Sequence, residues 1–382
     1  MKKKADVAII GGGITGCSLA YYLSKKKLDV VLFEKNYLSS GATGSCGAGI
    51  RQQWSTTENT KLAIDSVKIF EKLSNELGMD IEFRQGGYLI IIHDKKEMKQ
   101  SEKNVKMQRS LGLDVNILKP DEIIKIAPIL DIKGMKAIGA TFCPTDGHAN
   151  PFKTTFAFAK ASEKNGAEIN THKSVTNVLI NNNNDITGVE IDNKYKVKAD
   201  FVINAAGVWS KEISKKIGVN LPNKPLRKEI IATERLKPIF DCMVISFKDG
   251  IYFSQQKEGQ ILGGIPYEKE FGFKTIPTFD FLHHMSKTLV SYAPVLKHVK
   301  ILRHWTGFYD VTPDARPILG KTKINGFIQC SGFSGHGFML SPMVSKVLTE
   351  YISDGKTSEI LENLNIDRFK DKKIDHEMSV VG

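Results

Sequence analysis

The sequence predicts an α/β fold in which a parallel sheet covered by helices is interleaved with a second, antiparallel sheet. Three observations predict it. An apolar run, Asp6 to Ile10, leads through glycines into a helical pattern and then into a second apolar run, Val30 to Phe33. A later apolar run, Ala199 to Gly207, ends in small residues, as expected of a buried strand that approaches a ligand. Segments rich in aromatic residues and glycine turns lie between these pieces and are typical of antiparallel strands.

Length and composition are those of a globular protein with two domains. The 382 residues suffice for two full cores, and 41% of them are hydrophobic. The apolar runs fall short of the ~20 residues of a membrane-spanning helix, so we expect no transmembrane segment. Glycines interrupt the apolar run that follows Met1 to Lys4, so we expect no cleaved signal. Scattered cysteines without a C-x-x-C pair favour reduced thiols, a cytoplasmic location and no metal site: Cys17, Cys46, Cys143, Cys242 and Cys330.

The formal net charge of +12 admits two interpretations. A basic stripe with interleaved aromatic residues would favour nucleic-acid binding. The lysines are instead dispersed as pairs and triplets such as Lys25 to Lys27, which is typical of a solvated surface. We therefore expect no nucleic-acid partner, although the same field would attract an anionic substrate.

The first expected strand and helix are joined by a G-x-G-x-x-G turn. Gly11 permits the tight turn, Gly13 lets a pyrophosphate approach the backbone, and Gly16 lets the helix pack against the strand. Free N–H groups at the helix start favour phosphate oxygens. Glu34 ends the second strand, where a carboxylate accepts hydrogen bonds from an adenosine ribose. Because Glu34 argues against a 2′-phosphate, this segment predicts an NAD or FAD site and leaves that choice open.

The middle of the chain predicts one helix, one hairpin and the second sheet. Helical spacing runs from Pro151 to Asn165, and two β-prone segments, 175–180 and 186–191, flank four asparagines. Segments 83–93 and 242–266 carry the aromatic residues and glycine turns of antiparallel strands.

These patterns predict two domains that alternate along the chain. We expect a nucleotide-binding domain at residues 1–83, 150–218 and 318–382, and a substrate-binding domain at residues 84–149 and 219–317. One large continuous domain is the alternative.

A second glycine-rich loop, Gly332 to Met339, precedes a helical pattern from about Leu340 to Ile352. N–H groups at such a loop and helix start would stabilise negative charge. Taken alone, the loop is more typical of a flexible turn before a C-terminal helix.

Three blocks of the sequence together resemble the D-amino-acid oxidase superfamily of flavoproteins, in the branch of glycine and sarcosine oxidases. They are the glycine turn with Glu34, the run from Val202 to Trp209, and Gly332 to Met339 after Thr312-Pro313-Asp314. The resemblance covers nearly the whole chain. It implies a Rossmann-like FAD-binding domain with an interleaved antiparallel-sheet substrate domain.

Two further segments are similar to the β subunits of dye-linked L-proline dehydrogenases, a branch that also resembles heteromeric sarcosine oxidases. They run from Cys46 to Gln53 and from Pro144 to Gly147. Such subunits work beside partner chains, so the resemblance implies partner subunits in a hetero-oligomer.

The resemblance also implies that the dinucleotide is FAD and assigns residues to its parts. The pyrophosphate and its flanks would be held by Gly11, Gly13, Ile14, Thr15, Gly16, Thr43 and Gly44, and the ribose by Glu34 and Lys35. The isoalloxazine would lie along Ala48, Gly49 and Ile50, and the adenine would meet Val175, with Gly207 also at the cofactor. The pyrimidine edge would be bordered by Phe333, Ser334, Gly335, His336, Gly337, Phe338 and Met339.

Amino-acid oxidation to an imine requires a Cα–H aimed at flavin N5 and a neutral amine. Arg51 stands where similar sarcosine oxidases hold the substrate carboxylate, and its planar fork suits that group. Tyr252 and Tyr309 are expected to wall the substrate, with packing in the core as the alternative. His336 is the best-placed histidine for a catalytic role, with a structural role as the alternative.

Several positions depart from the patterns of the family. Tyr309 stands where glycine oxidases carry an arginine, which argues against simple glycine oxidase activity. Gly307 stands at the cysteine that tethers FAD in monomeric sarcosine oxidases, so we expect non-covalent FAD. Their oxygen-activating lysine aligns near Leu262, which predicts slow reaction with oxygen and electron transfer to a subunit, quinone or dye. Pro151 stands at the FMN-bearing histidine of heterotetrameric sarcosine oxidases, with His148 nearby, so FMN at a subunit junction would be non-covalent.

The sequence therefore predicts an FAD-dependent enzyme that oxidises a secondary or cyclic amino acid, such as proline, hydroxyproline or sarcosine, to its imine. Its expected partners are that small substrate and other subunits. The alternatives are an FAD-dependent 2-hydroxy-acid dehydrogenase, a flavoprotein domain that modifies RNA, and a flavin-holding subunit without activity.

Overall fold

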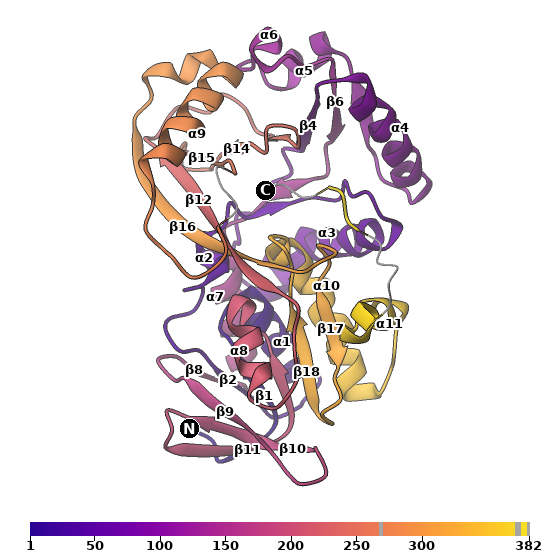
Figure 1. Cartoon of the computed structure of the whole chain (residues 1–382), viewed down its shortest axis with the longest axis vertical. Coiled ribbons are helices and arrows are strands. Elements are labelled where there is room, and N and C mark those ends of the chain that lie inside the picture. The colour runs from indigo at the N-terminus through magenta and orange to yellow at the C-terminus, as the bar shows by residue number, and fades with distance from the viewer. Residues whose placement is uncertain (267–269, 371–375, 380–382) are drawn as a thin grey trace.

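The computed structural model describes residues 1–266, 270–370 and 376–379, which form two large sheets (Figure 1). The first sheet is mostly parallel, and β9 (Val175–Ile180) and β10 (Ile186–Ile191) extend it as the predicted antiparallel hairpin. Its continuous strand order is β17 (Ile318–Lys321), β18 (Phe327–Ser331), β11 (Tyr195–Asn204), β1 (Lys4–Ile10), β2 (Val30–Phe33) and β8 (Glu168–Asn170). The carboxyl-terminal halves of β1 and β11 are mostly apolar and buried, as expected where helices and loops cover both faces of a sheet.

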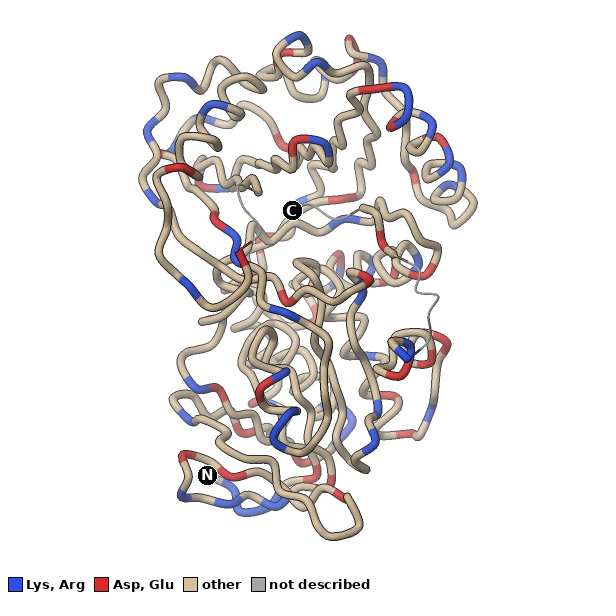
Figure 2. The backbone as a smooth tube through the Cα atoms, viewed as in Figure 1, with Lys and Arg blue, Asp and Glu red and all other residues tan. Residues whose placement is uncertain are grey.

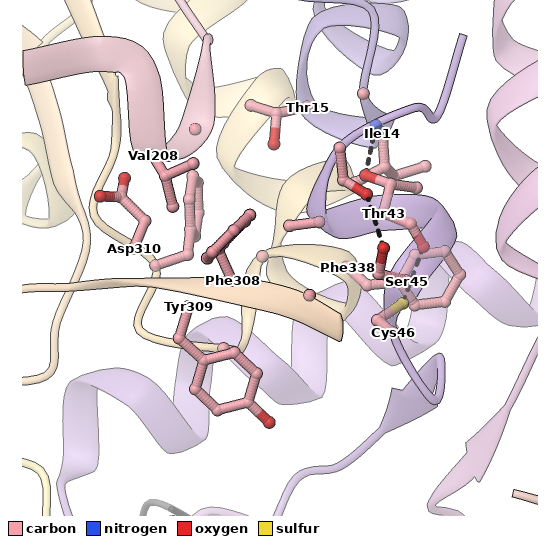
Figure 3. A pocket seen from close by; sticks show the side chains of 18 of the residues that line it. Ile14, Thr15, Thr43, Ser45, Cys46, Val208, Phe308, Tyr309, Asp310 and Phe338 are labelled. Atoms are coloured by element: carbon pink, nitrogen blue, oxygen red, sulfur yellow. Dashed lines mark hydrogen bonds between the residues drawn. The ribbon is translucent and has the colours of Figure 1, made fainter. Parts of the chain in front are cut away.

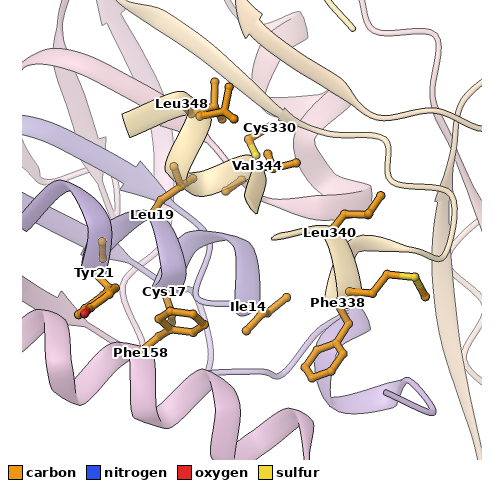
Figure 4. Packing of buried hydrophobic residues seen from close by; sticks show 14 of the residues in the cluster. Ile14, Cys17, Leu19, Tyr21, Phe158, Cys330, Phe338, Leu340, Val344 and Leu348 are labelled. Carbon is orange, nitrogen blue, oxygen red and sulfur yellow. The ribbon is translucent and has the colours of Figure 1, made fainter. Parts of the chain in front are cut away.

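Two helices that begin at glycine loops pack side by side on the first sheet. They are α1 (Ile14–Lys25) and α10 (Gly337–Asp354), with α7 (Pro151–Lys164) and α3 (Thr57–Leu77) beside them. Figure 4 shows the apolar contact, where Leu19 of α1 lies near Val344 and Leu348 of α10. Hydroxyl pairs cross the same contact, 2.7 Å between Thr15 and Ser341 and 2.6 Å between Ser18 and Ser345. The two helix starts therefore lie next to each other.

The second sheet is mostly antiparallel, as predicted, with a parallel pairing only between β13 and β4 in the described strands. Its order is β16 (Ile301–Val311), β12 (Lys224–Thr233), β15 (Ile261–Gly264), β14 (Tyr252–Gln255), β13 (Met243–Ser246), β4 (Tyr88–Ile92), β6 (Gly139–Cys143) and β5 (Asn116–Leu118). The helices of this part of the chain are α4 (Lys95–Ser110), α5 (Pro120–Ile126), α6 (Ile132–Met135) and α9 (Phe279–Tyr292).

The two faces of the second sheet contact different parts of the molecule, because successive side chains on a strand point to opposite sides. Leu89, Val244 and Phe253 belong to the apolar core that includes residues of α5, α6 and α9. Tyr88 and Met243 point to the opposite side, which we call the site face and which also carries Ile90, Ile245 and Tyr252.

Short elements connect the two sheets. Strands β3 (Gly49–Ile50) and β7 (Gly147–His148) pair with each other in a small sheet. The remaining elements are α2 (Ala42–Ser45), η1 (Gly207–Trp209), α8 (Ser210–Lys215), η2 (Pro294–His298), α11 (Glu359–Asn363) and η3 (Ile366–Lys370).

The observed elements follow the predicted ones with shifts at their ends. Helix α7 begins at Pro151, where Asn150 accepts hydrogen bonds from the first-turn N–H groups. Helix α10 begins three residues before the predicted Leu340, and only the second half of segment 83–93 is a strand. The domain limits given above stay a prediction.

The charged residues, the helices and the cysteines of the described chain bear on the predictions made from composition. Lys and Arg alternate with Asp and Glu along much of the trace (Figure 2), as expected of a solvated surface. Among the described helices, none combines the length and the apolar character that a bilayer span requires. All five cysteines are free, and four of them are buried.

Candidate active site

A long cavity runs from the carboxyl ends of β1, β2 and β11 to the site face of the second sheet. Figure 3 looks into it, with Ile14 and Thr15 of α1 on one side and Tyr309 on another. Open α/β sheets bind ligands at the carboxyl ends of their parallel strands. The predicted site residues that line this cavity are Gly11, Gly13, Ile14, Thr15, Glu34, Lys35, Thr43, Ala48, Gly49, Arg51, Val175, Gly207, Tyr252, Tyr309, Phe333, Gly335, His336, Gly337, Phe338 and Met339.

Four predicted residues do not line the cavity: Gly16, Gly44, Ile50 and Ser334. Gly16 lies behind it, where a Cβ atom would stand 1.9 Å from the carbonyl oxygen of Gly11. Ser334 is buried, and its hydroxyl accepts a hydrogen bond from Thr312 N at 3.1 Å. Gly44 and Ile50 likewise pack against protein atoms. In this structure these four residues support the lining, and their contact with the cofactor stays a prediction.

The start of α1 forms a narrow cradle of backbone. Gly11 has φ +110°, and a Cβ atom there would lie 2.5 Å from the carbonyl oxygen of Ala205. Gly13 precedes the helix without a side chain to cap it. Ile14 N donates to Thr43 Oγ1 at 3.1 Å, as the dashed line in Figure 3 shows. The positive end of the helix dipole therefore faces the cavity across a backbone that only glycine permits.

Glu34 and Lys35 are fixed beside this cradle. The Glu34 carboxylate is buried and accepts hydrogen bonds from Gly12 N at 2.7 Å and Asn36 N at 2.8 Å. The Lys35 ammonium lies 3.5 Å from the ring centroid of Trp209, and partial burial lowers its pKa. Since a carboxylate offers about four lone-pair sites, Glu34 keeps acceptor capacity for ribose hydroxyls.

The second glycine loop is held from behind by Asp310 of β16. Gly332 N donates to the Asp310 carboxylate at 2.6 Å, and Ser334 N donates to the Asp310 carbonyl at 2.9 Å. Burial raises the pKa of Asp310 to about 6, although hydrogen bonds from Asn223 and Gly332 oppose that rise. In Figure 3, Tyr309 and Asp310 point to opposite sides of β16, so one strand residue faces the cavity and the next supports the loop.

Three tyrosines stand over glycines of the expected flavin-lining segments. A Cβ atom on Gly49 would lie 1.6 Å from the Tyr88 hydroxyl, and one on Gly335 would lie 2.6 Å from the Tyr309 ring. A Cβ atom on Gly47 would lie 3.3 Å from the Tyr252 ring. Glycine is required at the first two positions because the aromatic rings occupy that space.

Burial keeps these tyrosines neutral. The side chains of Tyr252 and Tyr309 both line this end of the cavity. Burial raises the pKa of Tyr252 well above its usual range and that of Tyr309 to about 12, and it raises the pKa of Tyr88 as well. These three tyrosines therefore present apolar rings and uncharged hydroxyl groups to the cavity.

Arg51 is the buried cation of the site, with 2% of its surface exposed. Its Nη1 donates to Gln53 O at 3.0 Å and its Nη2 donates to Ser379 O at 2.5 Å. Its guanidinium carbon lies 4.3 Å from the ring centroid of Trp54. Of the five N–H groups of arginine, three are left without a recorded acceptor in the described residues. Burial lowers the pKa of Arg51, but from a value far above neutrality.

The segment that carries Arg51 is fixed by a buried carboxylate, Asp146. Its oxygens accept hydrogen bonds from Gln52 N at 2.7 Å and from Gln53 Nε2 at 3.0 Å. Burial raises the pKa of Asp146 to about 6, against those hydrogen bonds. The Pro144 to Gly147 motif thus positions the Arg51 segment.

His336 lines the cavity directly before α10, with its ring 4.5 Å from that of Trp54. Burial, and to a lesser extent the nearby Arg51 charge, lower the pKa of His336 to about 3. Its Nδ1 is buried and has no hydrogen-bond partner among the described residues. His336 is therefore a neutral imidazole that lines the cavity and carries no charge.

Sequence reasoning missed several lining residues on the second sheet, among them Tyr88, Lys228, Met243 and Ile245. In the sequence these residues show only the alternating pattern of a strand, and that pattern does not tell which face of the strand lines a cavity. The slow reaction with oxygen inferred from Leu262 stays a prediction. Leu262 does not line the cavity, whereas Lys228 does, with its ammonium 5.5 Å from the Tyr309 ring centroid. The residue at position 262 thus says nothing about the charge of this cavity.

The lining fits a flavin dinucleotide. The α1 cradle offers N–H groups and a dipole to a pyrophosphate, and Glu34 offers acceptors to an adenosine ribose. The start of α10 beside it offers the same kind of positive end to the flavin pyrimidine edge.

Comparisons with known proteins agree with this fit. The family model of FAD dependent oxidoreductases called DAO matches residues 6–351. The crystal structure of L-proline dehydrogenase from P. horikoshii superposes with a TM-score of 0.94 at 36% identity, covering 98% of this chain and 100% of that one. The sarcosine oxidase subunit beta of Arthrobacter sp is 28% identical over 375 residues, covering 97% of this chain and 92% of that protein. Glycine oxidase from Bacillus cereus ATCC 14579 shares the fold, with a TM-score of 0.84 at 24% identity over 94% of this chain and 97% of that one. Since the family model spans most of the sequence, the chain belongs to the DAO family of FAD dependent oxidoreductases.

Proposed function

We propose that this enzyme oxidises a secondary or cyclic amino acid, of the proline, hydroxyproline or sarcosine type, to its imine. The observation that carries the proposal is the buried guanidinium of Arg51. Its recorded hydrogen bonds within the described residues go to two backbone carbonyls and not to an acidic side chain, and three of its N–H groups are left for a ligand. A buried cation without a partner is costly, so a substrate carboxylate is its expected partner.

The cavity walls favour a substrate with an apolar ring or methyl group. Met243, Ile245 and the rings of Tyr252 and Tyr309 line the same end as Arg51. These side chains place no ionised carboxylate there to attract an ammonium group. They therefore favour the neutral amine that oxidation requires, while Arg51 holds the carboxylate and sets the orientation of the Cα–H.

FAD, when bound, supplies the acceptor for the hydride. His336 does not need to remove a proton in this scheme. As a neutral imidazole it adds no charge that would repel a substrate cation. Tyr309, at the position of the arginine in glycine oxidases, leaves carboxylate binding to Arg51.

We further propose that electrons leave toward a partner subunit or another acceptor rather than toward oxygen. Support comes from the similarity to an L-proline dehydrogenase and to a sarcosine oxidase subunit beta, whose name implies other subunits. FMN at a junction between subunits stays an expectation from the resemblance.

Anaerobic reduction tests the proposal. The FAD-loaded protein is mixed with L-proline, trans-4-hydroxy-L-proline, sarcosine, glycine or L-lactate, and the visible flavin absorbance is followed. We expect bleaching by at least one secondary amino acid and little by glycine. Bleaching by L-lactate alone would favour the 2-hydroxy-acid alternative, and no bleaching by any amino acid would overturn the proposal.

A further inference from the structure

The segment 376–379 lies against the Arg51 segment and is anchored by a buried carboxylate. Glu377 is 4% exposed, whereas the next residue, Met378, is 74% exposed. The Glu377 oxygens accept hydrogen bonds from Ser55 N at 3.0 Å, Thr56 Oγ1 at 2.8 Å, Asn59 Nδ2 at 2.8 Å, Ser379 N at 2.9 Å and the Ser55 hydroxyl. One side chain thus ties this segment to residues 55–59, directly after the Arg51 loop.

The same segment reaches the guanidinium itself. Ser379 is 6% exposed, and its carbonyl oxygen accepts the 2.5 Å hydrogen bond from Arg51 Nη2. Glu377 N donates to Asp314 O at 3.2 Å, and Met378 N donates to Ser55 Oγ at 3.0 Å. The position of the Ser379 carbonyl therefore depends on the Glu377 anchor.

Two carbonyls and one ring define the plane of the Arg51 guanidinium. Gln53 O accepts a hydrogen bond from Arg51 Nη1, and the Trp54 ring lies against the guanidinium. Both residues belong to the same loop as Arg51. From elsewhere in the described chain, the Phe247 ring lies 5.6 Å from the guanidinium carbon, and Ser379 O is the contact that accepts a hydrogen bond. Without it, the guanidinium could rotate about its own loop and lose the alignment that a bidentate carboxylate pair needs.

Glu377 is suited to this task as an anion. Burial alone would raise the pKa of its carboxyl, but the hydrogen bonds from Ser55, Ser379 and Asn59 outweigh that effect and lower the pKa. All of those neighbours donate to it, so an ionised carboxylate satisfies them.

We propose that Glu377 is a positioning residue for the substrate carboxylate. It locks segment 376–379 against residues 55–59, so that the Ser379 carbonyl holds the Arg51 guanidinium in the plane that receives the carboxylate. The inference rests on the proposed function, because it assigns the carboxylate to Arg51.

The test compares Glu377→Ala and Glu377→Gln with Met378→Ala, an exposed neighbour in the same segment, and with Arg51→Ala. The measurements are KM and kcat for L-proline, and the dissociation constant of tetrahydrofuran-2-carboxylate, a proline isostere without an amine, from its perturbation of the flavin spectrum. Pyrrolidine, which lacks the carboxylate, is the control ligand.

We expect Glu377→Ala to raise KM and the dissociation constant about tenfold, as for one misplaced charge-assisted hydrogen bond, and to change kcat less. Glu377→Gln keeps one acceptor oxygen and should show a smaller rise. Met378→Ala should match the wild type, Arg51→Ala should show the largest rise, and pyrrolidine should bind all variants alike.

Two results would overturn the inference. A Glu377 variant that melts earlier but binds tetrahydrofuran-2-carboxylate normally would show a structural role alone. Tighter binding would show that the Ser379 carbonyl competes with the substrate. If Glu377→Ala does not fold, Glu377→Gln carries the same comparison. If the wild type binds the isostere through Arg51 but is not reduced by any amino acid, the proposed function fails while this inference stands.

Discussion

At the scale of single residues, burial decides which ionisable groups around the cavity carry charge. Arg51 keeps its proton because even a lowered arginine pKa lies far above neutrality. His336 is neutral because burial and the Arg51 charge both disfavour a second cation. The tyrosines stay protonated for the same reason of burial. The substrate end thus combines a fixed guanidinium with neutral tyrosine and histidine side chains, and the Lys228 ammonium lies 5.5 Å from the Tyr309 ring centroid. A cationic end of this kind suits a substrate carboxylate.

The lowered pKa of His336 predicts a pH-dependent stability. The unfolded chain protonates this histidine below about pH 6.5, whereas the folded chain resists protonation down to about pH 3. The unfolded state therefore binds more protons in that window, so the free energy of unfolding falls as the pH is lowered through it. At pH 5.5 the contribution of His336 should have fallen by on the order of 1 kcal/mol.

His336→Gln isolates this effect, because glutamine does not titrate. Between pH 7.5 and 5, denaturant unfolding should show a smaller loss of stability in His336→Gln than in the wild type. His283→Gln, at an exposed histidine of α9, is the control and should follow the wild type. Parallel pH profiles for the wild type and His336→Gln would contradict the predicted protonation of His336 on unfolding.

At the scale of elements, the loop before α10 can be tested at Gly335. This residue has φ +93°, and a Cβ atom there would lie 2.6 Å from the Tyr309 ring. Gly335→Ala should therefore add a clash to the cost of a left-handed backbone, which is about 1–2 kcal/mol. Gly355→Ala is the matched control, since Gly355 ends α10 at φ +66° with no atom within 4 Å of its Cβ position.

Both glycine variants should melt earlier, but only Gly335→Ala should weaken FAD binding and slow flavin reduction. The measurements are thermal unfolding, FAD fluorescence titration and the anaerobic reduction rate. Equal FAD affinity in the two variants would show that Tyr309 and the loop can separate without disturbing the cavity.

The sequence was sufficient to predict the elements with strong local signals. The glycine turn before α1, the hairpin of β9 and β10, and the start of α7 at Pro151 all follow from turn and capping residues. Tyr88 was missed because its pattern fits an apolar strand and does not say which face meets the cavity. Glu377 was missed because its partners, Ser55 to Asn59, lie more than 300 residues away in the chain. Contacts between distant segments depend on the fold and leave no local pattern.

At the scale of the whole molecule, the cavity joins the two large sheets. Its lining takes the α1 cradle, Glu34 and Val175 from the first sheet and its loops, and Tyr88 and Tyr252 from the second. A ligand that fills the whole cavity therefore contacts residues of both sheets. A ligand that fills only the flavin end makes no contact with the α1 cradle.

This arrangement predicts that FAD stabilises the apoprotein more than riboflavin at equal concentration. A ligand that binds only the folded chain at 100 times its dissociation constant adds about 2.7 kcal/mol to the free energy of unfolding. Riboflavin lacks the pyrophosphate and the adenosine, so the N–H groups of α1 and the Glu34 carboxylate would gain no partner from it. Thermal unfolding with each ligand checks this, and Glu34→Gln should reduce the shift caused by FAD but leave the riboflavin shift unchanged. Equal shifts with both ligands would show that the adenosine end adds no binding energy and would overturn the assignment of the cradle.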